Sequence, residues 1–170
     1  MSTATELAEL AAWENRVQVE VGKLSGSIED KSFALNNSPL AEQYLLIHAA
    51  YTRLASHSQE ALKRAIFIQW YWTAEPSIYS GIHDLSDSAV DQALLLLEQR
   101  LQTNDLDQEW DWMLPWCYSI LEFMFERVEN QPRFQQILAA YSVNDWQAEP
   151  VLQPLEQRGI MGEYWLSMMD

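Results

Sequence analysis

Few residues in this sequence have the types and spacing that catalysis requires. The stretch G-I-H-D-L-S-D at 81–87 is the best candidate, because it groups His83 with two aspartates beside the start of a predicted helix. Capping of that helix already explains the aspartates. Glu75, the acid nearest an aromatic run, is better explained by a structural partner such as Arg64 or by a capping contact. We therefore expect no catalytic residue and a protein that is not an enzyme.

Metal and cofactor motifs are missing from the sequence. The histidines are His48, His57 and His83, and none follows a glutamate at the Glu-x-x-His spacing of di-iron bundles. The patterns H-E-x-x-H and C-x-x-C and the glycine-rich nucleotide loops are also missing. Cys117, the single cysteine, falls on an apolar helix seam, where a thiol packs as a small hydrophobe. We expect no metal and no cofactor.

The region from Leu106 to Glu129 contains the densest group of unusual residues, E-W-D-W-M-L-P-W-C-Y-S at 109–119. Its periodicity predicts one central helix whose apolar arc covers about two-thirds of the circumference. Pro115 removes a backbone hydrogen bond inside that pattern, and because the periodicity continues beyond it we expect a kink. The carboxylates of this helix share the remaining polar strip: Asp111, Glu122, Glu126 and Glu129.

This predicted helix leads to two binding hypotheses. In the first, the acidic strip binds a basic protein, because several carboxylates on one rigid helix steer a cationic partner. In the alternative, space opened by a kink at Pro115 holds a small apolar ligand among aromatic rings. The rings that would line that pocket are Trp70, Trp72, Trp112 and Trp116.

The charge of the chain favours the first hypothesis. Its 170 residues include 25 acids and 10 bases, for a formal net charge of −15. Residues 86–170 hold 15 of the acids and 4 of the bases, a net charge of −11. Such a surface repels nucleic acid and anionic lipid and attracts a basic protein. Immunity proteins and other toxin-neutralising inhibitors share this size and charge, which makes them the expected class by analogy of composition alone.

Apolar residues recur at helical spacing along almost the whole chain, and strand-like alternation is scarce. The pattern predicts helices over 4–24, 38–54, 57–73, 86–101, 106–129 and from Pro132 to Tyr141. The polar stretch 25–38 is expected to be a loop, and the tail from Val143 to be irregular, divided by Pro150 and later breakers. We expect a single all-α domain over 1–170, a bundle or array of about six helices.

The location of the protein is expected to be the cytoplasm. The start, M-S-T-A-T-E-L-A-E-L, has neither the positive charge nor the apolar run of a secretory signal. The apolar runs are far shorter than the roughly 20 residues that a membrane span needs. One cysteine cannot form an intramolecular disulfide, which is consistent with a reducing compartment.

Overall fold

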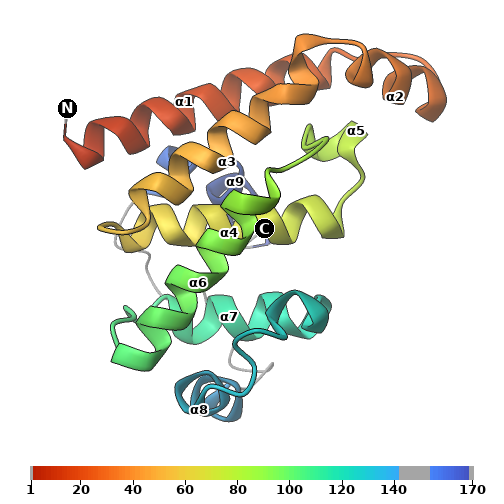
Figure 1. The fold of residues 1–170 in the computed structure, drawn as a ribbon. Helices are drawn as coiled ribbons and strands as arrows, with labels where there is room; N and C mark the ends of the chain where they lie inside the picture. Colours follow the sequence, from red (N-terminus) through yellow and green to blue (C-terminus); the bar gives the residue numbers. More distant parts are fainter. Residues whose placement is uncertain (1, 142–153, 169–170) are drawn as a thin grey trace.

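A computed structural model describes residues 2–141 and 154–168, and every regular element in that part of the chain is a helix. The α-helices are α1 (Thr3–Gly22), α2 (Ile28–Asn36), α3 (Gln43–Leu54), α4 (Gln59–Ala74), α5 (Ser77–Ser80), α6 (Asp87–Thr103), α7 (Trp110–Ile120), α8 (Pro132–Ala140) and α9 (Gly159–Ser167). Short 3-10 turns are η1 (Pro39–Glu42), η2 (Glu122–Phe125) and η4 (Leu155–Gln157). The expected all-α class is confirmed, with more and shorter helices than predicted (Figure 1).

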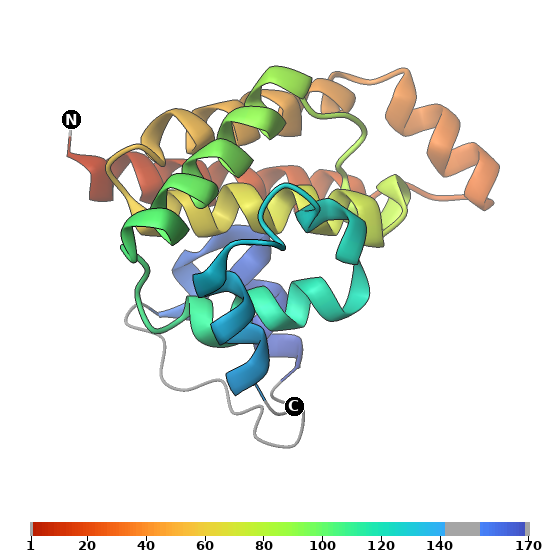
Figure 2. The ribbon, with the colours of Figure 1, turned by 60° about the horizontal axis from the view of Figure 1, so that its bottom comes forward.

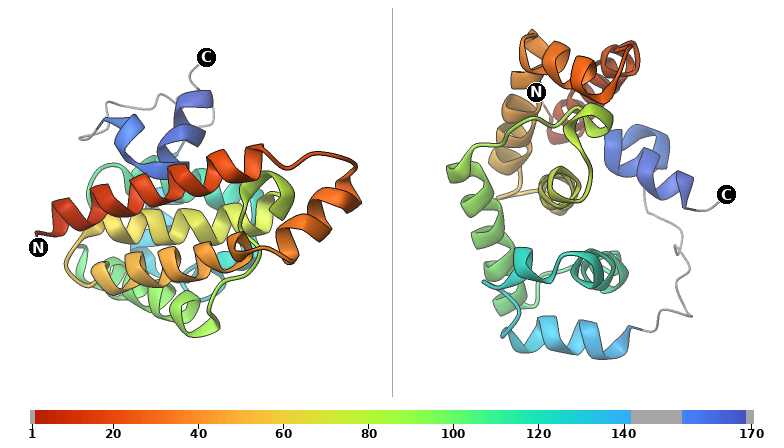
Figure 3. Two further views of the ribbon diagram at one scale, coloured as in Figure 1. Left: turned by 90° about the horizontal axis from the view of Figure 1, so that it is seen from above. Right: turned by 90° about the vertical axis from the view of Figure 1, so that its right-hand side faces the viewer.

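Helix α4 lies at the centre of the fold. Seen along its axis, α1 and α3 lie on one side, α7 and α8 on the opposite side, and α6 and α9 on the two remaining sides (Figure 3). All ten residues from Ala61 to Trp70 are buried, so the helix is covered all round. The nearly continuous apolar run of this segment is the sequence signature of such a helix. None of the described helices is both long and apolar enough to cross a membrane.

Several helix starts follow from local capping. The Ser38 hydroxyl accepts a hydrogen bond from the Leu40 N–H at 3.2 Å, and Pro39 occupies the first turn, as expected. The cap of α4 is Ser58, whose hydroxyl accepts a hydrogen bond from the Ala61 N–H at 3.1 Å. Ser86 does precede α6, but its side chain makes no capping hydrogen bond.

Residues 25–38 were expected to form a loop, and this prediction is wrong because they contain α2. Ser27 and Asp30 form a capping box, in which each side chain accepts a hydrogen bond from the other's backbone N–H. Only Leu35 of this helix is buried. The apolar periodicity that reveals a helix is therefore weak here. The helix projects from one end of the molecule (Figure 3).

The single helix predicted over 106–129 is also wrong, because it is two elements. Helix α7 begins at Trp110, runs through Pro115 and ends at Ile120. At Leu121 the backbone leaves the helical region, with φ −136° and ψ 71°, and η2 follows. The chain then turns back towards α6 before α8 begins (Figure 2). Pro115 therefore marks neither the start nor the end of the helix.

The prediction of an irregular tail is wrong in part. The portion with Val143 and Pro150 lies outside the described residues, but η4 and α9 are regular helical elements. Trp165 is fully buried and α9 packs against α1 and α4, so this end of the described chain folds back onto the body. This packing brings α9 between the aromatic residues of α4 and α7.

Candidate functional site

The predicted acidic residues lie mainly just beyond α7, in residues 120–129, here called the acidic segment. Phe125 and Val128 of this segment are fully buried and anchor it to the body of the protein. The ring of Phe125 stacks on that of Phe134 from α8, with centroids 5.8 Å apart. Arg127 anchors it laterally through an ion pair with Glu98 of α6 at 2.9 Å. The segment is therefore held at a fixed position on the body.

These anchors turn the other side chains of the acidic segment outwards. Glu122 and Glu126 are exposed and Glu129 is half-buried. Among the described residues, none of these carboxylates forms an ion pair or accepts a hydrogen bond. Between them stands Phe123, whose side chain is 60% exposed, and Ile120 at the end of α7 is 48% exposed. The segment thus presents apolar side chains beside unpaired negative charges.

Two of these carboxylates affect the pKa of Tyr118 in α7. The pKa of Tyr118 is raised by partial burial and then by the negative charges of Glu122 and Glu129. Negative charges near a phenol oppose its ionisation. The acidic segment is therefore a region of concentrated negative potential.

Asp111 does not belong to this surface. It lies in the first turn of α7, whereas Glu122 follows the last turn. Its carboxylate is 3.0 Å from the guanidinium of Arg133, which neutralises it. The prediction of four carboxylates on one rigid helix is wrong because α7 ends at Ile120, and the other three lie in the acidic segment after it.

The tryptophans of the alternative hypothesis are only partly brought together. The ring of Trp165 in α9 stands 4.8 Å from that of Trp112 and 6.4 Å from that of Trp116, centroid to centroid. Trp70 lies 5.3 Å from Tyr164 of the same helix. Side chains of α9 therefore occupy the space that these three rings border.

Trp72 lies apart from that space and takes part in a different pocket. Its indole N–H donates to the His83 carbonyl oxygen at 3.3 Å, and both residues line an open pocket of about 460 Å³. Glu75 lines the same pocket. Glu75 and His83, the catalytic candidates in the sequence, therefore line one shallow pocket. Within the described residues, no group of three or more histidine, cysteine or acidic side chains is arranged to hold a metal ion.

A buried network of ionisable groups fixes α9 to the body. Arg158 is fully buried and donates two hydrogen bonds to the Glu60 carboxylate and two to that of Glu109, over 2.5 to 2.9 Å. Lys63 lies 2.5 Å from Glu109 and 2.8 Å from Asp107. Burial raises the pKa of Glu60, but the hydrogen bonds and positive charges of Arg158 and Arg64 together outweigh it, and the pKa is lowered. The carboxylate is therefore held ionised.

Glu14 of α1 extends the network to the other side of α9. It accepts hydrogen bonds from the Tyr51 hydroxyl at 2.5 Å and from the Ile160 backbone N–H at 3.1 Å. Arg64 donates to the same hydroxyl at 3.2 Å. Burial raises the pKa of Glu14 to about 7 in spite of these contacts. The core therefore contains a carboxyl group, that of Glu14, whose pKa is close to neutral pH.

Sequence reasoning missed this network. It named only Arg64, as one possible partner of Glu75, but Arg64 pairs with Glu60 at 2.7 Å. Glu75 instead is the residue that ends α4, where its backbone N–H donates to the Tyr71 carbonyl oxygen. The members bond chiefly to one another and to the backbone, so we interpret the network as a structural clamp. No sequence signal predicts a partnership between residues so distant along the chain.

Comparison with known proteins gives no further guide to the function. No protein-family model matches the chain, and neither a curated protein nor a solved structure matches it.

Proposed function

We propose that the protein is a non-enzymatic binding module that captures a basic protein partner through the acidic segment. The observation that supports this most directly is Phe123, an exposed aromatic ring in a segment that also carries three carboxylates without partners among the described residues. Toxin-neutralising inhibitors of the immunity-protein kind remain the class that size and charge favour by analogy.

Aromatic and charged side chains make different contributions to binding in protein interfaces, and the acidic segment has both kinds. An exposed aromatic side chain supplies an anchor that gains free energy when it is desolvated by a partner. Surrounding carboxylates contribute to rapid association and to the choice of a cationic partner more than to affinity. The proposal therefore assigns anchoring to Phe123 and Ile120, and steering to Glu122, Glu126 and Glu129.

Rigidity of the surface also supports the proposal. Phe125, Val128 and the Arg127–Glu98 pair hold the acidic segment in place before any partner arrives. A pre-ordered surface loses less conformational entropy on binding than a mobile one. Asp111 has a smaller role in this version of the hypothesis because Arg133 already neutralises it.

A pull-down with matched variants tests the proposal. Wild-type protein is immobilised and exposed to lysate of the natural host at low and high salt. One variant combines Glu122→Gln, Glu126→Gln and Glu129→Gln, and another is Phe123→Ser. The control removes the same charge elsewhere, through Glu42→Gln, Asp91→Asn and Glu156→Gln, three exposed acids outside the segment.

We expect one basic protein to be recovered by the wild type and by the control, in amounts that fall with salt. Both acidic-segment variants should recover at least about tenfold less, equivalent to 1.4 kcal/mol. Equal recovery by the wild type and the acidic-segment variants, or recovery of no basic protein at either salt concentration, would count against the proposal.

A further inference from the structure

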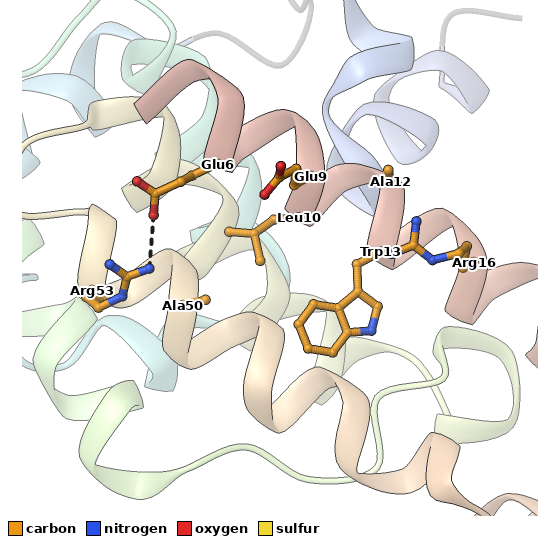
Figure 4. Close-up of a pocket in the computed structure, with 8 residues that line it drawn as sticks. All are labelled: Glu6, Glu9, Leu10, Ala12, Trp13, Arg16, Ala50 and Arg53. Carbon is orange, nitrogen blue, oxygen red and sulfur yellow. Dashed lines mark hydrogen bonds and ion pairs between the residues drawn. The ribbon is translucent and has the colours of Figure 1, made fainter. Parts of the chain in front are cut away.

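A groove of about 440 Å³ runs between α1 and α3, on the face opposite the acidic segment (Figures 1 and 4). The two helices are antiparallel, because the Trp13 indole donates to Gln43 at 2.8 Å and Arg53 pairs with Glu6 at 3.1 Å. These two contacts lie towards opposite ends of the groove. The helices are thereby held at a fixed separation.

The floor of the groove is apolar. It is formed by Leu10 and Trp13 from α1 and by Ala50 from α3. Leu46, one turn before Ala50 on the same face of α3, is 50% exposed. Ala12 adds a small exposed side chain on α1. Apolar surface is therefore uncovered between α1 and α3. The side-chain ridge of a third helix could pack into the groove between them.

The charges of the groove are balanced, unlike those of the chain as a whole. Two acids, Glu6 and Glu9, and two bases, Arg16 and Arg53, line it, so its net charge is zero on a chain of −15. Neither Glu9 nor Arg16 has an ion-pair partner among the described residues. A strongly basic or strongly acidic partner gains nothing from such a surface.

We propose that two copies of the chain associate through this groove, with α1 of each copy antiparallel to α1 of the other. Glu9 and Arg16 are seven residues apart, roughly 10 Å along the helix axis. A two-fold axis beside Ala12 brings Glu9 of one copy against Arg16 of the other, and the reverse contact forms at the same time. The unpaired charges of the groove thus satisfy each other between copies.

The distance between Glu9 and Arg16 favours a second copy of α1 over a small zwitterion as the occupant of the groove. An amino acid carries its ammonium and carboxylate on one carbon, so it does not bridge charges roughly 10 Å apart. Glu6 and Arg53, the closer pair, already bind each other at 3.1 Å. A second copy of α1 supplies both charges at the required separation.

Charge reversal with rescue tests the association. The mass of the particle is measured by analytical ultracentrifugation over a range of concentrations. The salt concentration is near physiological, where screening limits repulsion between two acidic chains. The variants are Glu9→Arg, Arg16→Glu and the double variant. Glu126→Arg, in the acidic segment, is the matched control for Glu9→Arg. Circular dichroism verifies that each exposed substitution leaves the fold intact.

We expect dimers for the wild type, for the control and for the double variant, in which the intermolecular pairs are restored with their signs exchanged. Each single reversal converts both pairs into like-charge contacts and should raise the dissociation constant at least about tenfold. A wild type that stays monomeric overturns the proposal. So do single variants that dimerise normally, a folded double variant that stays monomeric, or a control that loses the dimer.

Discussion

The guanidinium of Arg158 hydrogen-bonds the Glu60 carboxylate at 2.8 and 2.6 Å, across 98 residues of sequence and in the absence of solvent contact on the arginine. This contact joins the last helix to the central one. A second carboxylate, that of Glu109 from the residue before α7, completes the surroundings of the same guanidinium. The position of α9 is therefore fixed by charge as well as by apolar packing.

Removing the charge of Arg158 should destabilise the protein severely. Arg158→Met keeps much of the aliphatic volume but leaves Glu60 and Glu109 buried beside too few cations. We expect a loss of about 3 to 5 kcal/mol in the free energy of unfolding, measured by urea denaturation. Arg133→Met, which breaks a partly exposed pair with Asp111, should lose less than about 1 kcal/mol. Similar losses in the two variants would contradict a clamp at Arg158.

Gly159 should tolerate no side chain. Its φ is +59°, and a Cβ there would lie 2.2 Å from Oε1 of Glu14, which Tyr51 and the Ile160 N–H hold in place. We expect Gly159→Ala to cost about 2 to 4 kcal/mol. Gly22→Ala is the control, because it lies at a helix end with no atom within 4 Å of the added Cβ. That variant should be neutral or slightly more stable in the same denaturation experiment.

The elements best predicted from the sequence are those that bury a continuous face. In α4, ten successive residues are buried, and the apolar run made this helix predictable over 57–73. The central position was predicted for residues 106–129 instead, and that prediction is wrong because α4 lies at the centre. Helix α2 buries only Leu35 and was missed. The break after Ile120 was also missed, because Val128 still falls on the seam that a continuous helix would bury. Burial patterns report which side chains face inwards and are insensitive to a local change of backbone.

The candidate site was predictable to a lesser degree. The exposure of Glu122 and Glu126 follows from their position opposite the apolar residues. The neutralisation of Asp111 by Arg133 does not, because it depends on how α8 returns against α7. The Arg158–Glu60 contact is inaccessible to sequence reasoning for the same reason. Periodicity assigns a residue to a helix face, and only tertiary packing assigns its partner.

Glu14 should make stability fall as the pH rises from weakly acidic to neutral. Burial raises its pKa in the folded protein to about 7, from an ordinary value of 4.5. Its contribution is fully present below pH 4.5 and is lost as the pH rises through 7, because the unfolded chain ionises more easily. A shift of this size corresponds to roughly 3 kcal/mol.

The variant Glu14→Gln isolates this contribution because it keeps the shape and cannot ionise. Free energies of unfolding of both proteins are measured between pH 4.5 and 8. The difference between them should move in favour of the variant by roughly 3 kcal/mol over this range. Parallel curves would show that the carboxyl of Glu14 titrates normally in the folded protein.

His48 should make stability fall as the pH is lowered, whereas Glu14 makes it fall as the pH is raised. The ring is fully buried, its Nε2 lies 3.0 Å from the Gln69 amide nitrogen, and burial lowers its pKa to about 4 from 6.5. A base with a depressed pKa contributes stability above pH 6.5 that is lost as the pH falls through 4. The variant His48→Gln should therefore lose roughly 3 kcal/mol less than the wild type between pH 6.5 and 4. The control is His57→Gln, at an exposed histidine, and its stability should change with pH as that of the wild type does. A His48→Gln variant whose stability changes with pH in the same way as the wild type would refute the prediction.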